Sequence, residues 1–143
     1  MNICDLISNQ DTYGTDANQT VFEVAKAMVS RNIGAVPVLR DGRLVGIFSE
    51  RDLMSRVVAE GLDPRTTQVA QVMTKDPLTV SRTESVENCM QLMRRHGFRH
   101  LPVCDGQCVV AVVSLRDILL HDLTEKVDEV RMMRAYIQAS PEV

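Results

Sequence analysis

The sequence predicts a mixed α+β protein. Two tandem repeats, each β-α-β-β-α, are expected to pack about a pseudo-twofold axis, with a further helix at the C-terminal end. Three observations predict this fold: the chain repeats itself at a fixed spacing, capped helical segments alternate with short β-rich segments, and 45% of the residues are hydrophobic against 24% charged. A chain of 143 residues is long enough for two small halves that share a core, and too short for a typical barrel enzyme.

The repeat is visible in matching motifs. Pro37 in Gly-Ala-Val-Pro-Val and Pro102 in Arg-His-Leu-Pro-Val lie 65 positions apart. The same spacing places Ser-Glu-Arg-Asp at 49–52 on Ser-Leu-Arg-Asp at 114–117. The segments that lead into each copy, residues 3–8 and 69–74, also resemble each other. These matches indicate a tandem duplication.

Each copy gives the same local prediction. A short strand precedes a helix whose N-cap is a hydroxyl residue, Thr20 or Ser85, and whose apolar residues recur with a period near 3.6. Two β segments joined by an Asp-Gly turn follow, and Ser-x-Arg-Asp then opens a second helix. The strands are expected near 13–15, 35–39 and 44–48 in the first copy, and near 78–80, 100–104 and 108–113 in the second.

Gly-Leu-Asp-Pro at 61–64 ends the last helix of the first copy and begins a linker. The expected units are therefore 1–65, 66–122 and a C-terminal helix or tail at 123–143. In the tail, apolar residues fall on one helical stripe, which predicts an amphipathic helix for core packing or for a dimer contact: Leu123, Val127, Val130, Met133 and Ile137.

Composition excludes several classes of protein. The formal net charge is −3, there is no Trp, and aromatic residues make up 3%, which argues against nucleic-acid binding. No apolar run approaches the ~18 residues of a membrane span, and the start lacks the pattern of a secretion signal. The four cysteines form no dense framework, so we expect free thiols and a cytoplasmic location.

The segment Ser114-Leu115-Arg116-Asp117 has the chemistry of a nucleotide site. A strand is expected to end and a helix to begin here, so free backbone amides and the positive helix end favour an anion. Arg116 suits a phosphate, and the acceptor-only carboxylate of Asp117 suits a pair of ribose hydroxyls. Ser-x-x-Asp is also a capping-box pattern, and both roles can coexist.

Taken together, these motifs resemble the cystathionine β-synthase (CBS) domain pair, or Bateman module, over nearly the whole chain. The resemblance implies a non-catalytic regulatory module that binds adenosine nucleotides (AMP, ADP or ATP, in some members NAD or S-adenosylmethionine) between its halves. It also implies association in pairs, regulation of a partner protein, a role in energy sensing, and no required cofactor.

The resemblance to the gamma subunit of AMP-activated kinase implies which residues hold the nucleotide. Arg99 and His100 would meet phosphate together with Ser114 and Arg116, and Asp117 would bind the ribose. The adenine would lie against residues of the first copy: Thr20, Ala25, Ser49, Val36 and Pro37. A weaker second site is expected at Arg51, Asp52 and Ser85, because Gly34 and Ala35 replace the basic pair there and Met90 replaces Ala25.

Three other functions are weighed against nucleotide binding. No nucleophile–base signature, Walker loop or GxGxxG motif is present, so an enzyme is not expected. Cys104, Cys108 and His100 suggest zinc, but both cysteines flank a hairpin turn and lack a second ligand pair, so no metal is expected. The main rival is an interaction or dimerisation module that binds no small molecule.

Overall fold

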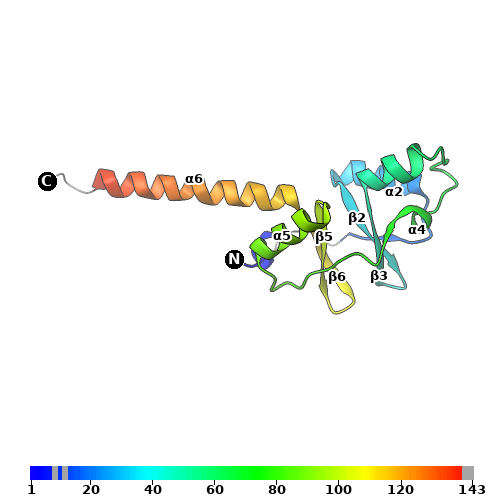
Figure 1. Ribbon diagram of the computed structural model, residues 1–143, viewed down its shortest axis with the longest axis horizontal. Helices are drawn as coiled ribbons and strands as arrows, with labels where there is room; N and C mark the ends of the chain where they lie inside the picture. Colours follow the sequence, from blue (N-terminus) through cyan, green and yellow to red (C-terminus); the bar gives the residue numbers. More distant parts are fainter. Residues whose placement is uncertain (8–9, 11–12, 140–143) are drawn as a thin grey trace.

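The computed structural model describes residues 1–7, 10 and 13–139, and it has the predicted two-repeat architecture (Figure 1). The first repeat contains the short strand β1 (Thr15–Asp16), helix α2 (Val21–Arg31), the hairpin β2 (Ala35–Arg40) and β3 (Arg43–Ser49), and the helical segments α3 (Glu50–Asp52) and η1 (Leu53–Val58). The second contains α5 (Val86–His96), the hairpin β5 (His100–Asp105) and β6 (Cys108–Ser114), and α6 (Leu115–Ala139). Two short helices, α1 (Cys4–Ile7) and α4 (Val69–Val72), lead into the repeats, and β4 (Thr74–Lys75) follows α4.

The strands form one sheet in each repeat. The first sheet has the order β1-β2-β3-β4, in which β1 is parallel to β2 and the other neighbours are antiparallel. The second sheet is the hairpin β5-β6. The strand predicted near 78–80 is not formed, and only Val80 makes an isolated parallel bridge, to Val103. In both hairpins the register shifts at the equivalent place, after Val38 and after Val103, so the copies share even their irregularity. Strand β6 contacts both β2 and β3, and this contact joins the two repeats.

The segments that lead into the repeats are exchanged between them. Ile3, which precedes the first repeat in sequence, is completely buried in the core of the second, and its amide donates to the carbonyl of Glu84 at 3.0 Å. Val69 is likewise buried in the core of the first repeat, and its amide donates to the carbonyl of Gln19 at 2.8 Å. Each lead-in therefore belongs to one repeat by sequence and to the other by packing, which interlocks the two halves.

Two hydrophobic cores result, one in each repeat. The first is built on helix α2, the β2–β3 hairpin, η1 and α4, and it consists of Ala17, Val21, Val24, Met28, Val36, Val38, Phe48, Val57, Val69, Val72 and Met73. The second is built on α1, α5, β5, β6 and the first turn of α6, and it consists of Ile3, Ile7, Val80, Val86, Cys89, Met93, Leu101, Val103, Ala111, Val113 and Ile118. The apolar positions of α2 and α5 that recur with a period near 3.6 mostly lie in these cores.

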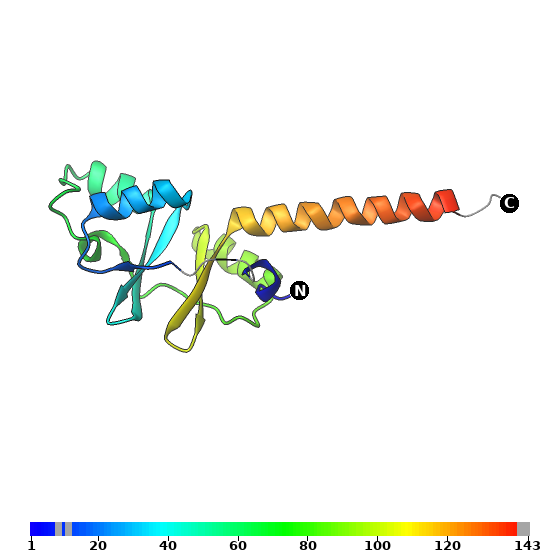
Figure 2. The same ribbon diagram turned by 180° about the vertical axis from the view of Figure 1, so that it is seen from behind.

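Helix α6 is longer than the predicted tail helix. It begins at Leu115, directly after β6, and continues without interruption to Ala139, so the expected boundary at residue 122 falls inside it. The segment contains neither Gly nor Pro, which explains why nothing breaks the helix. Figures 1 and 2 show α6 leaving the second repeat as a straight rod that extends well beyond the rest of the molecule.

Candidate functional site

The segment Ser114–Asp117 forms a capping box at the start of α6. The amide of Asp117 donates to Ser114 Oγ at 3.0 Å, and the amide of Ser114 donates to Asp117 Oδ2 at 3.1 Å. The capping interpretation of this motif is therefore confirmed. The cap uses Oδ2 of Asp117, and the Asp117 residue is half-buried. Among the described residues, Ser114 is the group that donates a hydrogen bond to this carboxylate.

The equivalent carboxylate in the first repeat is more heavily engaged. Asp52 forms the same capping box with Ser49, whose amide and hydroxyl both donate to Oδ2, at 3.0 and 3.1 Å. Thr74 Oγ1 donates to Asp52 Oδ1 at 3.2 Å, and Arg56 Nε lies 3.7 Å from the same oxygen. Asp52 is only 7% exposed, so its carboxylate is enclosed by groups of the protein itself.

Thr74 and Arg56 are not among the site residues predicted from the sequence. Arg56 also donates to the backbone carbonyl of Met73 at 2.7 Å, so it ties α4 and β4 to the helical segment that follows β3. Two signals could have found this cluster: Arg56 follows Asp52 by four positions on a predicted helix, and Thr74 lies in the repeated lead-in. Ser8, which matches Thr74 in the first lead-in, lies outside the described residues.

His100 lies at the junction of the two repeats. A Cβ placed on Gly34 would come within 3.3 Å of His100 Nε2 and 3.2 Å of Glu50 Oε1, so the imidazole of the second repeat packs against backbone of the first. Burial lowers the pKa of His100 below its ordinary value of 6.5. The negative charges of Glu50 and Asp117 act against this lowering of the pKa, and the positive charge of Arg99 adds to it.

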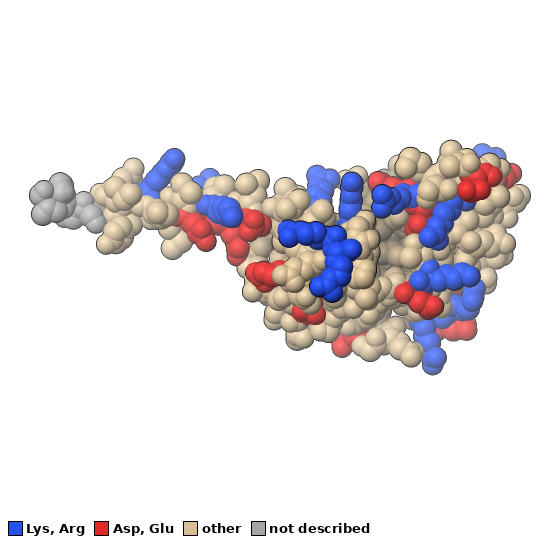
Figure 3. Space-filling model, viewed as in Figure 1, with Lys and Arg blue, Asp and Glu red and all other residues tan. Residues whose placement is uncertain are grey.

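The structure thus brings several of the predicted site residues together. Asp117, Ser114 and His100 lie at one end of the β5–β6 hairpin, where His100 pairs with Ser114 across the strands, and Arg99 and Arg116 adjoin them in the chain. Both arginines are exposed, and within the described part of the chain neither forms an ion pair. Figure 3 shows Lys and Arg side chains gathered over α5 and the adjacent surface. Glu50, which is not among the predicted site residues, adds a negative charge at the same junction.

Most of the residues expected to line the adenine are buried in the core of the first repeat or are engaged in helix caps. Thr20 caps α2, where its hydroxyl accepts from the amide of Glu23 at 3.2 Å, and Ala25 is half-buried on the same helix. Val36 is completely buried in the core of the first repeat and Pro37 is buried beside it, so Val36 leaves no surface to a ligand in this structure. Ser49 is occupied by the Asp52 capping box.

Residues of the expected second site have mostly structural partners. Arg51 Nη1 donates to the backbone carbonyl of Gly97 at 3.3 Å, which connects the first repeat to the end of α5 in the second. Ser85 caps α5, its hydroxyl accepting from the amide of Asn88 at 3.1 Å. With the enclosed carboxylate of Asp52, these contacts leave few polar groups of this site free for a ligand.

No metal centre is found in the part of the chain that the structure describes, where no group of three or more His, Cys, Asp or Glu residues could hold an ion. The four cysteines are free thiols. Burial, and to a lesser extent the charge of Glu84, raises the pKa of Cys89 to about 11. Burial also raises the pKa of Cys104. No helix within the described ranges is long and apolar enough to cross a membrane.

Comparison with known proteins matches this architecture to one family. The family model of the CBS domain matches twice, at residues 7–59 and 69–123. The chain belongs to the CBS-domain family. CBS domains are in general regulatory rather than catalytic, so the two matches confirm the tandem repeat and the broad class of function.

The similar proteins include both curated and solved examples. The chain is 32% identical over 126 residues to the mitochondrial CBS domain-containing protein CBSX3 of Arabidopsis thaliana, and the match covers 85% of this chain and 61% of that protein. A putative signal-transduction protein with CBS domains from Burkholderia ambifaria has a TM-score of 0.82 at 28% identity, covering 87% and 95% of the two chains. The hexameric CBS-CP12 protein of bloom-forming cyanobacteria has a TM-score of 0.79 at 26% identity, covering 97% and 86%.

Proposed function

We propose that this CBS-domain pair is a regulatory module that binds an adenosine nucleotide at the junction of its repeats and reports it to a partner protein. The observation that carries the proposal is the placement of His100 and Asp117. Both are titratable groups of the second repeat, and His100 lies against Gly34 and Glu50 of the first. A ligand held there would contact both halves, so binding would be coupled to their relative arrangement.

The chemistry of the junction suits a nucleoside phosphate. Arg99 and Arg116 are exposed cations beside His100 and Ser114, and a guanidinium binds phosphate through paired, charge-assisted hydrogen bonds. Asp117 offers a carboxylate acceptor to ribose hydroxyls. Glu50 repels phosphate, so we place the phosphate on the arginine side of His100 and the sugar on the carboxylate side.

The difference between Asp52 and Asp117 supports unequal sites. Asp52 accepts from Ser49 and Thr74 and faces Arg56, so a ribose would have to displace contacts within the protein. Asp117 accepts from Ser114 alone among the described residues, and it is more exposed. We therefore assign the stronger nucleotide site to Asp117.

Calorimetric titration of the purified protein with AMP, ADP, ATP, NAD and S-adenosylmethionine tests the proposal. Asp117→Asn keeps an oxygen that can accept from the Ser114 amide but removes the charge. Because a hydrogen bond to a charged group contributes about 1.5–3 kcal/mol, we expect affinity to fall by about 10-fold to 150-fold. Asp52→Asn is the matched control, and it should leave this affinity within about 3-fold of the wild type, well under the 1.4 kcal/mol of a tenfold change.

Thermal unfolding separates a lost ligand contact from a lost cap. A ligand that binds only the native state raises the unfolding midpoint. This rise should be smaller in Asp117→Asn, as its weaker binding requires, while the midpoint without ligand changes little. If none of the five compounds binds at millimolar concentration, the nucleotide proposal is wrong. Equal loss of binding in both Asn variants would contradict the assignment of the stronger site.

A second candidate function is an interaction module that binds no small molecule. It is favoured by the apolar side chains that α6 exposes, among them Leu123, Val130 and Ile137 at 60%, 47% and 68%. We propose that assembly and nucleotide binding are separate properties of the same chain, and the related hexameric CBS-CP12 protein supports assembly. Failure of all five titrations would leave this second function as the better one.

A further inference from the structure

The projecting part of α6 carries an apolar stripe, interrupted by Arg134, that the rest of the described chain does not cover. The first turn is anchored, because Ile118 is completely buried in the core of the second repeat. From Leu119 onward, large apolar side chains are exposed by between 43% and 75%: Leu119, Leu120, Leu123, Val127, Val130, Met132, Met133, Tyr136 and Ile137. The rod that they belong to extends about 30 Å from Leu119 to Ala139 at 1.5 Å per residue (Figure 1).

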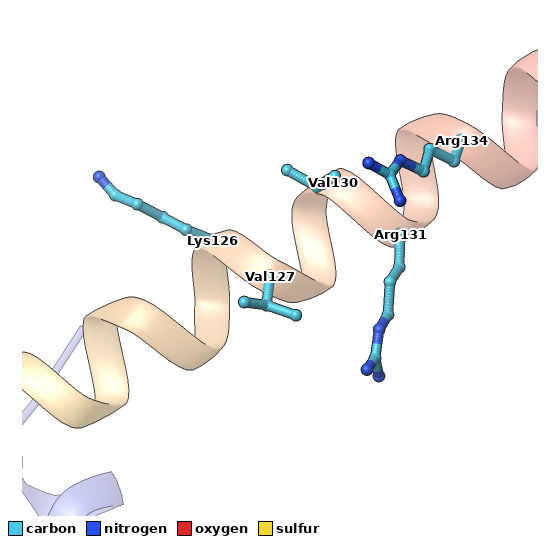
Figure 4. Close-up of a pocket in the computed structure, with 5 residues that line it drawn as sticks. All are labelled: Lys126, Val127, Val130, Arg131 and Arg134. Atoms are coloured by element: carbon cyan, nitrogen blue, oxygen red, sulfur yellow. The ribbon is translucent and has the colours of Figure 1, made fainter.

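A projecting helix that packs against nothing leaves its apolar side chains exposed to water. Isolated helices gain little stability in water, and most helical stability in proteins comes from burying an apolar face. Spacings of three and four residues align one set of positions along α6, as in the seam of a helix pair: Leu120, Leu123, Val127, Val130, Arg134 and Ile137. Val127, Val130 and Arg134 of this seam line a pocket together with the neighbouring Lys126 and Arg131, and Figure 4 shows these five side chains along the helix.

We infer that this seam pairs with the same seam of a second copy of the chain, with the two helices antiparallel. In an antiparallel pair centred between residues 127 and 130, Val127 faces Val130, Leu120 faces Ile137, and Leu123 faces Arg134. Every seam position then meets another seam position of the partner, as an interface with twofold symmetry requires. The pairing needs no residue outside the projecting part, and the end of each helix reaches the point where the other helix leaves its own repeat.

The charges along α6 favour the antiparallel direction. Four acidic residues lie between 122 and 129, namely Asp122, Glu125, Asp128 and Glu129, whereas residues 130–139 carry Arg131 and Arg134 and no acid. The antiparallel register brings Arg131 and Arg134 of each helix level with residues 122–129 of the other, and it separates the two Arg134 side chains, each of which faces Leu123. Parallel helices in register would instead stack Arg134 on Arg134 within the seam, where like charges repel.

A membrane surface suits this helix less well than a second copy does. Helices that lie on membranes are typically rich in Lys and Arg on their polar face. Helix α6 contains five acidic residues and four basic ones, so its net charge is −1: Asp117, Asp122, Glu125, Asp128 and Glu129 against Arg116, Lys126, Arg131 and Arg134.

Molar mass in solution tests the seam, and a matched pair of variants isolates it. Val127→Asp places a charge in the centre of the seam, and Met132→Asp places the same charge on an exposed residue about 140° away around the helix. We expect Val127→Asp to halve the molar mass measured by sedimentation at micromolar concentration, and Met132→Asp to leave it unchanged. Circular dichroism and the unfolding midpoint check that both variants remain folded.

Disulfide trapping tests the direction of the pair. In a background where Cys4, Cys104 and Cys108 are changed to Ser, a chain with Leu120→Cys is mixed with a chain carrying Ile137→Cys and then oxidised. Antiparallel pairing yields crosslinks between the two kinds of chain and few within either kind, whereas parallel pairing yields crosslinks within each kind. A monomeric wild type, a mass insensitive to Val127→Asp, crosslinks within each kind, or sedimentation with lipid vesicles in place of self-association would each overturn the inference. None of these results depends on whether a nucleotide binds.

Discussion

Ile3 offers a direct test of the exchanged lead-ins. Its side chain is completely buried in the core of the second repeat, although in sequence it precedes the first. Ile3→Ala removes three carbon atoms, each contributing about 0.8 kcal/mol by transfer from water. The cavity left behind adds to this loss, so the free energy of unfolding should fall by about 3 kcal/mol, within the range of about 2–5 kcal/mol typical of buried Ile→Ala changes.

Urea denaturation measures this loss, with Met1→Ala as the control because Met1 is 49% exposed two positions away. Hydrogen exchange then locates the effect, since amides of α5, β5 and β6 should exchange faster while those of α2 and β2 change less. A loss below about 1 kcal/mol, the usual effect of a weakly packed position, would refute the reasoning. Faster exchange confined to the first repeat would refute it as well.

Three further predictions follow from the ionisable groups. Burial lowers the pKa of His100, so below pH 6.5 the unfolded chain binds a proton more readily than the folded protein does. The free energy of unfolding contributed by this group should therefore be fully present above pH 6.5 and should fall as the pH drops below it. In urea denaturation, His100→Gln should flatten this part of the dependence of stability on pH. With a thiol reagent at pH 8, exposed Cys4 and Cys108 should react quickly and Cys89 slowly until the protein unfolds, and four equal rates would show that the core is open. Asp52→Ala leaves the Ser49 amide and the Thr74 hydroxyl without their acceptor, so it should lower the free energy of unfolding by about 2–4 kcal/mol. Asp117→Ala should lower it by about 1 kcal/mol. Thermal unfolding of the two variants measures both losses, and equal losses would contradict the difference between the two carboxylates.

The hairpins and their turns were predictable because their signals are local. Alternating β-branched residues around an Asp-Gly turn indicate two strands whatever surrounds them, and the observed strands extend the predicted ones by one or two residues. The same holds for the caps, since Thr20 and Ser85 bond to amides three residues away. Because the chain is duplicated, each of these local signals occurs twice, so the sequence predicts a pair of repeats.

Side-chain burial and long-range partners were harder to predict. An apolar residue such as Val36 is equally suited to the wall of a ligand site and to a hydrophobic core, and only the packed structure shows that it lies in the core. Thr74 meets Asp52 across 22 residues of chain, a contact that no local pattern contains. The exchange of lead-ins was equally hidden, because Ile3 and Val69 have the same apolar character whichever core receives them.

The capping box of Asp117 connects the proposed nucleotide site to the projecting helix. Asp117 lies in the first turn of α6, Ile118 anchors that turn in the core, and no Gly or Pro interrupts the helix from Leu115 to Ala139. A rod of this length is about 36 Å long, so a tilt of about 5° at the cap would displace its far end by about 3 Å. A ligand that draws Asp117 away from Ser114 would therefore move the far end of α6, and with it the helix pair that we propose. Because His100 and Asp117 lie at the junction of the repeats, a change in the arrangement of the two halves would reach α6 through the same first turn.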